Sequence, residues 1–479
     1  MALKSPEEYI SSLRQMKPRI FVQGKKVESV VDHPLLRPAV NTFCLTYEMA
    51  QDPKYRELMT TTSHLTGEII NRFNHIYLSP DDLVKKLEMV RTCSQKALCI
   101  LRCMGGEALN GIAVGTFAID KKKGTNYYQR FVRFAKHFQE EDLICAQALT
   151  DVKGDRSLRP FQQADPDLFV RIVDRRSDGI VVRGAKDHIT GAAASHYIFA
   201  MPSRTLTEKD KDYAVAFVVP CDVEGLTHIV SPTLKTPDLQ EDRPASSKYS
   251  TVESMLIFDD VFVPWENVFM CGEWDAMEPM LLSFATTHRH SRCACSSGVT
   301  DILTGASSLI AKYNGLEKVS HIRDKLIELS AAAETYYASG LISSILATKT
   351  ESGYYSPSIL HANVGKLWTA KLFHESVRLV QEIAGGLIDT VPSISDWRNP
   401  ELQPFLEKYL KGKADVPTEY RLRLFRLLQD LTTCGIACYW LTLSAVGAGS
   451  PQGAKIMIQR ETDYSFKEGL AKALAGIPV

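Results

Sequence analysis

The residue pattern changes twice along the chain, from helical to strand-like and back to helical, and these changes restrict the fold. Residues 1–144 read as mostly helical. Residues 145–275 contain short β-branched and aromatic runs between turn residues, such as 180–184 after the turn pair Asp178-Gly179. From 276 onward the pattern is helical again. We predict an α+β fold with an N-terminal helical domain at 1–144, a middle β-barrel or β-sandwich domain at 145–275 and a C-terminal helical bundle at 276–479.

The composition excludes several classes of protein. Lys+Arg and Asp+Glu both number 56, so the net charge is zero and a nucleic-acid partner is not expected. The 11 cysteines are scattered, as is typical of a reducing compartment. Residues 5–8 read as the capped start of a helix rather than a signal peptide. No run reaches the roughly 18 apolar residues of a membrane span, so we predict a cytoplasmic protein.

Cysteines and histidines gather in two short stretches far apart in the chain. Cys99 and Cys103 form the first, and the pattern that begins near 81 allows one helix to continue through both to Gly105-Gly106. The second stretch, 288–295, contains two histidines and two cysteines. Thiolates with an imidazole suit iron–sulfur clusters or zinc. The alternative is that these cysteines only pack in the core, because only the first half has a common zinc spacing.

Other polar segments have two interpretations each. The run 150–156 is either a surface loop or the lining of a flavin or phosphate site. Gly385-Gly386 either ends a helix or lets a cofactor approach the backbone. Glu253 either faces solvent or acts as a base beside a metal site. The glycine-rich run 447–453 resembles a dinucleotide loop, but no strand precedes it, so we predict a loop between helices.

Several segments together resemble one known family. It is the 4-hydroxybutyryl-CoA dehydratase/vinylacetyl-CoA isomerase family, which is related to the flavin-dependent 4-hydroxyphenylacetate 3-hydroxylases. The resemblance covers nearly the whole chain and implies an acyl-CoA dehydrogenase-like fold. The segments that carry it are 31–34, 50–53, 150–156, 181–186, 321–328, 383–386 and 447–452.

The resemblance also implies two cofactors and their binding residues. The ligands of a [4Fe-4S] cluster match Cys99, Cys103, His288 and Cys295. FAD is expected between the β domain and the C-terminal bundle, with Thr190 near the flavin ring. The other residues expected near FAD are Thr150, Asp151, Lys153, Arg156, Gly385 and Gly386. Members that resemble this chain are homotetramers, so self-association is expected.

The chemistry implied by the resemblance is radical dehydration of a 4-hydroxyacyl-CoA, isomerisation of a 3-enoyl-CoA such as vinylacetyl-CoA, or both. In that family the flavin takes an electron from the enolate, which acidifies the C3–H bond. A histidine on an exchangeable iron takes the proton, and the iron assists the departing hydroxyl. The catalytic positions match His288, Glu253 and Arg91.

Four positions depart from that family as the resemblance defines it. Arg292 replaces a tyrosine, Ser296 a lysine, Leu443 a glutamate and Leu101 a glutamine. We therefore expect a paralogue with a different acyl-CoA, or with isomerisation but no dehydration. Two alternatives stay open, namely a flavin-dependent aromatic hydroxylase without a cluster and a non-catalytic cofactor-bearing paralogue. Cys293 is either a competing ligand or a buried neighbour of Cys295.

Overall fold

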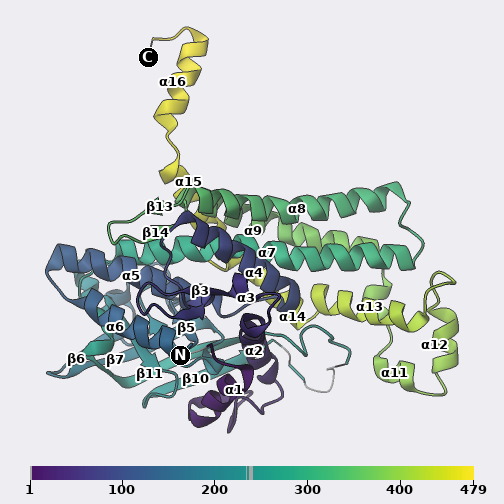
Figure 1. The fold of residues 1–479 in the computed structure, drawn as a ribbon, viewed down its shortest axis with the longest axis horizontal. Helices are drawn as coiled ribbons and strands as arrows, with labels where there is room; N and C mark the ends of the chain where they lie inside the picture. The colour runs from purple at the N-terminus through teal and green to yellow at the C-terminus, as the bar shows by residue number, and fades with distance from the viewer. Residues whose placement is uncertain (1–2, 234, 237–240, 479) are drawn as a thin grey trace.

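The computed structural model describes residues 3–233, 235–236 and 241–478. Helices of the N-terminal part cover one side of a β-rich region, and a long helical bundle lies against both (Figure 1). The first helix begins with the expected capping box, in which the Glu8 amide donates to Ser5 Oγ at 3.1 Å. The main N-terminal helices are α1 (Pro6–Gln15), α2 (Arg37–Gln51), α3 (Arg56–Met59), α4 (Pro80–Ala97), α5 (Cys103–Lys123) and α6 (Tyr127–Glu140).

The β-rich region consists of two main sheets. The larger has the strand order β2-β1-β10-β11-β7-β6 and the smaller the order β12-β9-β8-β5. The strand bounds are β1 Arg19–Val22, β2 Lys25–Lys26, β5 Cys145–Ala148, β6 Arg171–Arg175, β7 Gly179–Thr190, β8 Tyr197–Ala200, β9 Val215–Pro220, β10 Leu226–Pro232, β11 Val252–Pro264 and β12 Val268–Cys271. The strand β1 pairs in parallel with β10, so the N-terminal segment contributes to a sheet that we had expected from 145–275 alone.

The C-terminal half is helical, as the alanine- and leucine-rich pattern predicts. Its long helices run side by side (Figure 1). They are α7 (Glu278–Tyr313), α8 (Ser320–Ile345), α9 (Ile359–Ala384), α13 (Thr418–Thr432), α14 (Gly435–Val446) and α15 (Pro451–Glu461). Within the described ranges no single helix is long and apolar enough to cross a membrane, although the bent pair Thr418–Thr432 and Gly435–Glu461 passes by length and composition.

Glycines let α5 and α7 approach each other closely. A Cβ atom on Gly111 would lie 2.8 Å from the Cβ of Phe284, and one on Gly115 would lie 2.2 Å from the Cβ of Met280. From Gly111 to Gly115 the contact moves four residues forward along α5, and from Phe284 to Met280 it moves four residues backward along α7. The two helices are therefore antiparallel. Continued by one turn, this register places Glu107 opposite His288.

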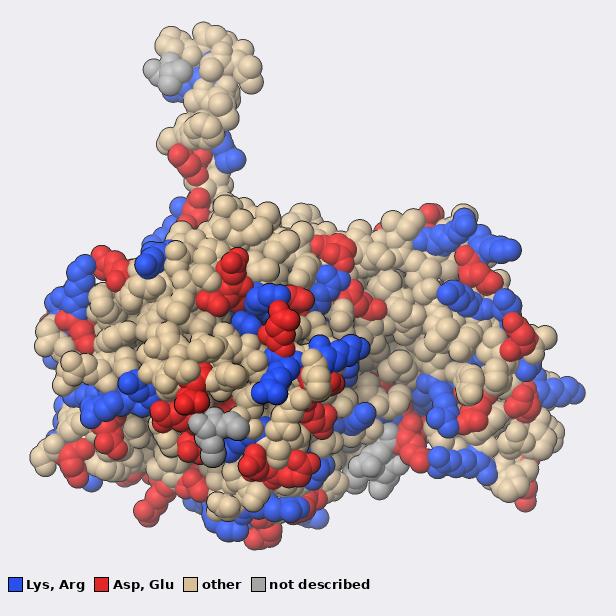
Figure 2. Space-filling model, viewed as in Figure 1, with Lys and Arg blue, Asp and Glu red and all other residues tan. Residues whose placement is uncertain are grey.

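The last helix, α16 (Tyr464–Ala475), stands away from the body of the molecule (Figures 1 and 2). Its apolar side chains are exposed, with Leu474 at 92% and Phe466 at 64%. The outer face of α8 also exposes apolar side chains, namely Ile327, Ile342 and Ile345. Isolated exposed apolar residues are ordinary, whereas several together on one projecting helix form a larger exposed apolar surface.

The close packing of α5 against α7 predicts a large penalty for Gly115→Ala. The added methyl group overlaps Met280, and overpacking typically costs about 1–3 kcal/mol in unfolding free energy. Gly305→Ala on α7 is the matched control, because a Cβ there meets no atom within 4 Å and alanine raises helix propensity. Thermal unfolding should show a lower Tm for Gly115→Ala and an unchanged or higher Tm for Gly305→Ala. Equal melting temperatures would contradict the packing argument.

Candidate functional site

The two cysteines of the first stretch lie at a break between helices, not on one continuous helix. The helix α4 ends at Ala97, and Leu98 adopts a left-handed backbone with φ 63°. Cys99 follows in the turn and Cys103 begins α5. The expectation of one helix ending at Gly105-Gly106 was therefore wrong. Gly106 lies in the first turn of α5, where a Cβ would come within 2.0 Å of the Phe73 carbonyl oxygen.

His288 and Cys295 both project from α7, seven residues and about two turns apart, and so lie on one helix face. The His288 Nδ1 is 2.6 Å from Glu107 Oε2, and the ring stacks on Phe284 at 5.8 Å. The second oxygen of Glu107 lies 3.6 Å from Lys86 Nζ. Glu107 is fully buried and Lys86 nearly so. This Lys86–Glu107–His288 chain orients the imidazole and leaves its Nε2 as the atom able to bind a metal.

The Cys295 thiol acts on both thiols of the first stretch, since it contributes to the raised pKa of Cys99 and of Cys103. Burial raises the pKa of Cys99 to about 12, and the Cys295 thiol adds to the increase. Burial, Glu107 and the other two thiols raise the pKa of Cys103 well above its usual value. Burial raises the pKa of Cys295, while the Arg292 guanidinium opposes this increase. The fold thus gathers three thiols from two distant parts of the chain.

Thiols and an imidazole are donor types that an iron–sulfur cluster can use. Among the described residues, no group of three or more His, Cys, Asp or Glu side chains converges as a site for one metal ion. A cluster is larger than an ion, so its ligands surround it at greater separations. Soft thiolates with one oriented imidazole are suitable ligands.

Cys293 faces the opposite side of α7 from Cys295. Two residues along a helix correspond to about 200° of rotation. The Cys293 Sγ donates to the Arg289 carbonyl at 3.4 Å, and it packs so closely on α9 that a Cβ on Gly365 would lie 2.4 Å from it. These contacts favour Cys293 as a buried neighbour rather than a ligand.

Glu253 and Thr190 meet where β11 and β7 pair. Thr190 Oγ1 donates to Glu253 Oε2 at 2.9 Å. The other oxygen, Oε1, is buried and has no hydrogen-bond partner within the described part of the chain. Burial raises the pKa of Glu253 from 4.5 to about 8, so this carboxyl group is mostly protonated at neutral pH. Tyr439 links this pair to the thiols, because its hydroxyl lies 3.4 Å from Cys99 Sγ and Glu253 raises its pKa.

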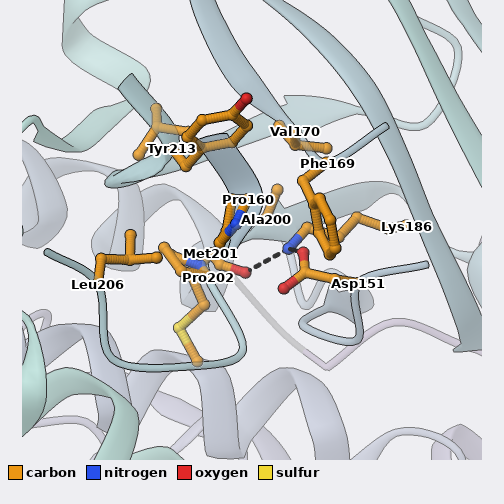
Figure 3. A pocket seen from close by; sticks show the side chains of 11 residues that line it. Asp151, Pro160, Phe169, Val170, Lys186, Ala200, Met201, Pro202, Leu206 and Tyr213 are labelled. Carbon is orange, nitrogen blue, oxygen red and sulfur yellow. Dashed lines mark hydrogen bonds and ion pairs between the residues drawn. The ribbon is translucent and has the colours of Figure 1, made fainter. Parts of the chain in front are cut away.

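The segment 150–156 combines a buried anchor with an exposed loop. Asp151 pairs with Lys186, which also donates to the Met201 carbonyl at 2.8 Å. Ser203 Oγ donates to the second Asp151 oxygen at 2.6 Å. Figure 3 shows Asp151, Lys186 and Met201 in the lining of a small pocket in the β region, together with aromatic and apolar side chains. Within the segment, Thr150 is half-buried, and Lys153 and Arg156 are exposed.

The remaining expected site residues lie in other surroundings. Gly385 caps α9 with φ 75°, and its amide donates to the Gln381 carbonyl at 2.8 Å. Gly385 and Gly386 are both exposed, and a Cβ on either would meet no atom within 4 Å. The local role is thus the helix cap, and the backbone stays open to solvent.

Arg91 joins three helices rather than reaching the thiols. Its guanidinium pairs with Asp301 at 2.9 Å and Glu334 at 2.6 Å, and it lies 4.5 Å from the Tyr337 ring centroid. These contacts connect α4 with α7 and α8. Both carboxylates occupy its donors, so the structure gives Arg91 a positioning role, and a catalytic role stays a prediction.

Sequence reasoning overlooked Lys86, Glu107 and Tyr439. One signal was present for Glu107, because it is the only charged residue between 103 and 119. It follows Cys103 by four residues and so shares its helix face. Lys86 had no such signal, since a lysine within an amphipathic helix normally lies on the solvent side.

Comparison with known proteins agrees with this architecture. The family model for the 4-hydroxyphenylacetate 3-hydroxylase N terminal matches residues 5–270, and that for its C terminal matches 277–476. The 4-hydroxybutyryl-CoA dehydratase/vinylacetyl-CoA-Delta-isomerase of Clostridium aminobutyricum is 43% identical over 488 residues, covering 99% of this chain and 100% of that protein. The oxygenase component of 4-hydroxyphenylacetate 3-monooxygenase from Thermus thermophilus is 28% identical, covering 89% of this chain and 88% of that protein.

Solved structures show the same relationship. An oxygen-tolerant archaeal 4-hydroxybutyryl-CoA dehydratase from N. maritimus superposes with a TM-score of 0.95 at 41% identity, covering 100% of this chain and 96% of that one. The oxygenase component HpaB, complexed with FAD and 4-hydroxyphenylacetate, superposes with a TM-score of 0.89 at 25% identity, covering 98% of each chain. The chain therefore belongs to the 4-hydroxyphenylacetate 3-hydroxylase family and, within it, to the dehydratase/isomerase enzymes of the 4-hydroxybutyryl-CoA dehydratase/vinylacetyl-CoA isomerase type.

Proposed function

We propose that this enzyme binds FAD and a [4Fe-4S] cluster and acts on a short-chain acyl-CoA, by dehydrating a 4-hydroxyacyl-CoA, by isomerising a 3-enoyl-CoA such as vinylacetyl-CoA, or by both. The observation that carries the proposal is the set of one buried and two half-buried thiols, together with a histidine whose Nδ1 is occupied by Glu107. A flavin hydroxylase has no evident need for such a set. The FAD bound by HpaB supports the flavin half of the proposal.

In this proposal the cluster ligands are Cys99, Cys103, His288 and Cys295. The flavin is held by Thr190, by the exposed glycines at the end of α9 and by Thr150, Asp151, Lys153 and Arg156. When bound, the flavin supplies one-electron chemistry and the cluster supplies a Lewis-acidic iron. We also propose the acyl-CoA dehydrogenase-like division into domains at 1–144, 145–275 and 276–479.

In this proposal His288 and Glu253 donate and accept protons. Glu107 keeps the proton of His288 on Nδ1, so Nε2 carries the lone pair of the ring and can hold either a metal or a proton, but not both at once. Thr190 occupies one oxygen of Glu253. The Glu253 proton is therefore presented from Oε1, the atom without a partner in the described residues. Both groups can transfer a proton to or from an acyl chain placed between the sheet and α7.

A second class of function, a non-catalytic cofactor-bearing paralogue, depends on the altered positions. Ser296 and Leu101 are buried, and Ser296 Oγ lacks a partner among the described residues. The thiols, His288 and Glu253 are nevertheless all present and buried or half-buried. Turnover of any acyl-CoA by the purified protein would exclude the non-catalytic alternative.

The first prediction from this proposal distinguishes Cys293 from Cys295, which lie two residues apart. In protein purified without oxygen, Cys295→Ala should lose most of its iron and acid-labile sulfide, because it removes a proposed ligand. Cys293→Ala should keep about four irons per chain, the number that a [4Fe-4S] cluster contains, because its thiol packs on α9. Iron, sulfide and flavin analysis of both variants and the unmodified enzyme measures this. Flavin without iron in the unmodified enzyme would favour the hydroxylase alternative.

The second prediction concerns the buried carboxyl group of Glu253. The folded chain holds its proton up to about pH 8, whereas an exposed glutamate loses it near 4.5. The contribution of this group to the unfolding free energy therefore falls as the pH rises from 4.5 to 8. Glu253→Gln cannot ionise, so its unfolding free energy should not fall in this way. Relative to the unmodified protein, it should rise by as much as a few kcal/mol across this pH range.

Thermal unfolding between pH 5 and 8.5 measures this difference. Glu266→Gln, at an exposed glutamate nearby in sequence, should follow the unmodified protein throughout. Parallel curves for Glu253→Gln and the unmodified protein would show that the carboxyl group is ionised in the folded state.

The third prediction concerns self-association, for which we propose a homotetramer. The exposed apolar side chains of α16 and of the outer face of α8 are available to other copies of the chain. Deleting residues 463–479 should therefore give a smaller assembly in light scattering coupled to size-exclusion chromatography. The double variant Lys467→Ala and Lys472→Ala, which changes only charges on the arm, is the control. An unchanged mass after deletion would assign the assembly to another surface.

A further inference from the structure

Arg292 is a buried cation with an incomplete set of partners. Its residue is 2% exposed and lies in the centre of α7. The guanidinium lies over the Trp440 ring at 4.6 Å, and its Nη1 donates to Cys295 Sγ at 3.6 Å. Its Nε and Nη2 have no hydrogen-bond acceptor in the described part of the chain. A buried cation with unused donors is costly unless an anion completes it.

The two unused donors form one geometric unit. The N–H bonds of Nε and Nη2 are parallel on the same edge of the guanidinium, which matches the two oxygens of a carboxylate. Trp440 covers a face of the group, so a ligand must approach in the plane of that edge. The nearby Trp440 Nε1 is another buried donor without a partner among the described residues. These unused groups are all donors, which indicates an acceptor-rich ligand.

The protein's own carboxylates do not fill this place. Glu107 already pairs with Lys86 and His288, and Glu253 accepts from Thr190. No ion pair to Arg292 is formed within residues 3–233, 235–236 and 241–478.

The position of Arg292 identifies the part of a substrate that it can reach. It contacts Cys295, a proposed cluster ligand, and its charge influences Cys99 and Tyr439. It therefore lies at the reacting end of the site. The phosphates of a CoA thioester lie at the opposite end of that molecule from the acyl chain, so they are not the anion in question.

We propose that the Nε–Nη2 edge of Arg292 binds a carboxylate carried by the acyl chain, so the substrate is the CoA thioester of a dicarboxylic acid. The inference rests on the proposed acyl-CoA function and specifies its substrate class. Arg292 then acts as a specificity-determining residue. An acyl chain that ends in a methyl group leaves its two donors buried without a partner.

The experiment compares saturated thioesters that bind without reacting. Succinyl-CoA is paired with butyryl-CoA, and glutaryl-CoA with pentanoyl-CoA, so that each pair differs by a carboxylate against a methyl group. Binding to the holoenzyme, prepared without oxygen, is measured by calorimetry. We expect at least one carboxylate-bearing thioester to bind about tenfold or more tightly than its partner, as a charged hydrogen-bonded pair provides.

Three variants attribute the preference to Arg292. Arg292→Tyr should abolish it, because it removes the cation and both donors. Arg292→Lys should lose most of it, because a point charge cannot form the paired contact. Arg423→Gln removes an exposed positive charge elsewhere and should keep the preference. Flavin content and thermal unfolding establish that each variant is folded.

The possible results distinguish a failure of the Arg292 assignment from a failure of the proposed acyl-CoA function. Equal binding within both pairs by the unmodified enzyme overturns the assignment of Arg292 but leaves the acyl-CoA function standing. A preference that persists in Arg292→Tyr also overturns it. If no thioester binds, the acyl-CoA function itself fails, and the inference fails with it.

Discussion

The buried carboxylate of Glu107 is the constraint on which the site depends. It lies on α5 and pairs with Lys86 on α4 and His288 on α7, so one side chain connects three helices. Burial alone would raise its pKa, but His288 and Lys86 hold the pKa below its usual value. Removing one partner from a buried charged group typically costs about 3–5 kcal/mol. The same contact sets the tautomer of His288, so helix packing and the chemistry of the imidazole are coupled.

Periodicity predicted the larger elements of the fold because packing there follows the local pattern. The strand expected around 180–184 lies within β7, and the helical pattern expected from 276 onward begins with α7 at Glu278. The pairing of β1 with β10 was not predictable, because 208 residues separate Ile20 from its partner His228. A four-residue strand also has little periodicity of its own. Tertiary pairing determined that element.

Residue type indicated the two stretches of the candidate site but not their geometry. The resemblance assigned Cys99, Cys103, His288 and Cys295 within them, but the pattern around Leu98 contains no glycine or proline to mark the helix break. Leu98 instead adopts φ 63° while its side chain and that of Ile100 are buried. Packing of these side chains sustains a backbone conformation that leucine seldom adopts. The position of Cys99 depends on that turn.

Buried cations around α7 shift the electrostatics of the site in one direction. Arg289, Arg292 and Lys366 are all buried there. Lys366 donates to the Ser444 carbonyl at 2.7 Å, at the end of α14 where the helix dipole favours a cation. Burial, together with the two arginines, nevertheless lowers its pKa to about 7. The lowered pKa of Lys366 shows that this part of the bundle disfavours further positive charge. It therefore favours anions, such as thiolates on one side of Arg292 or a ligand on the other.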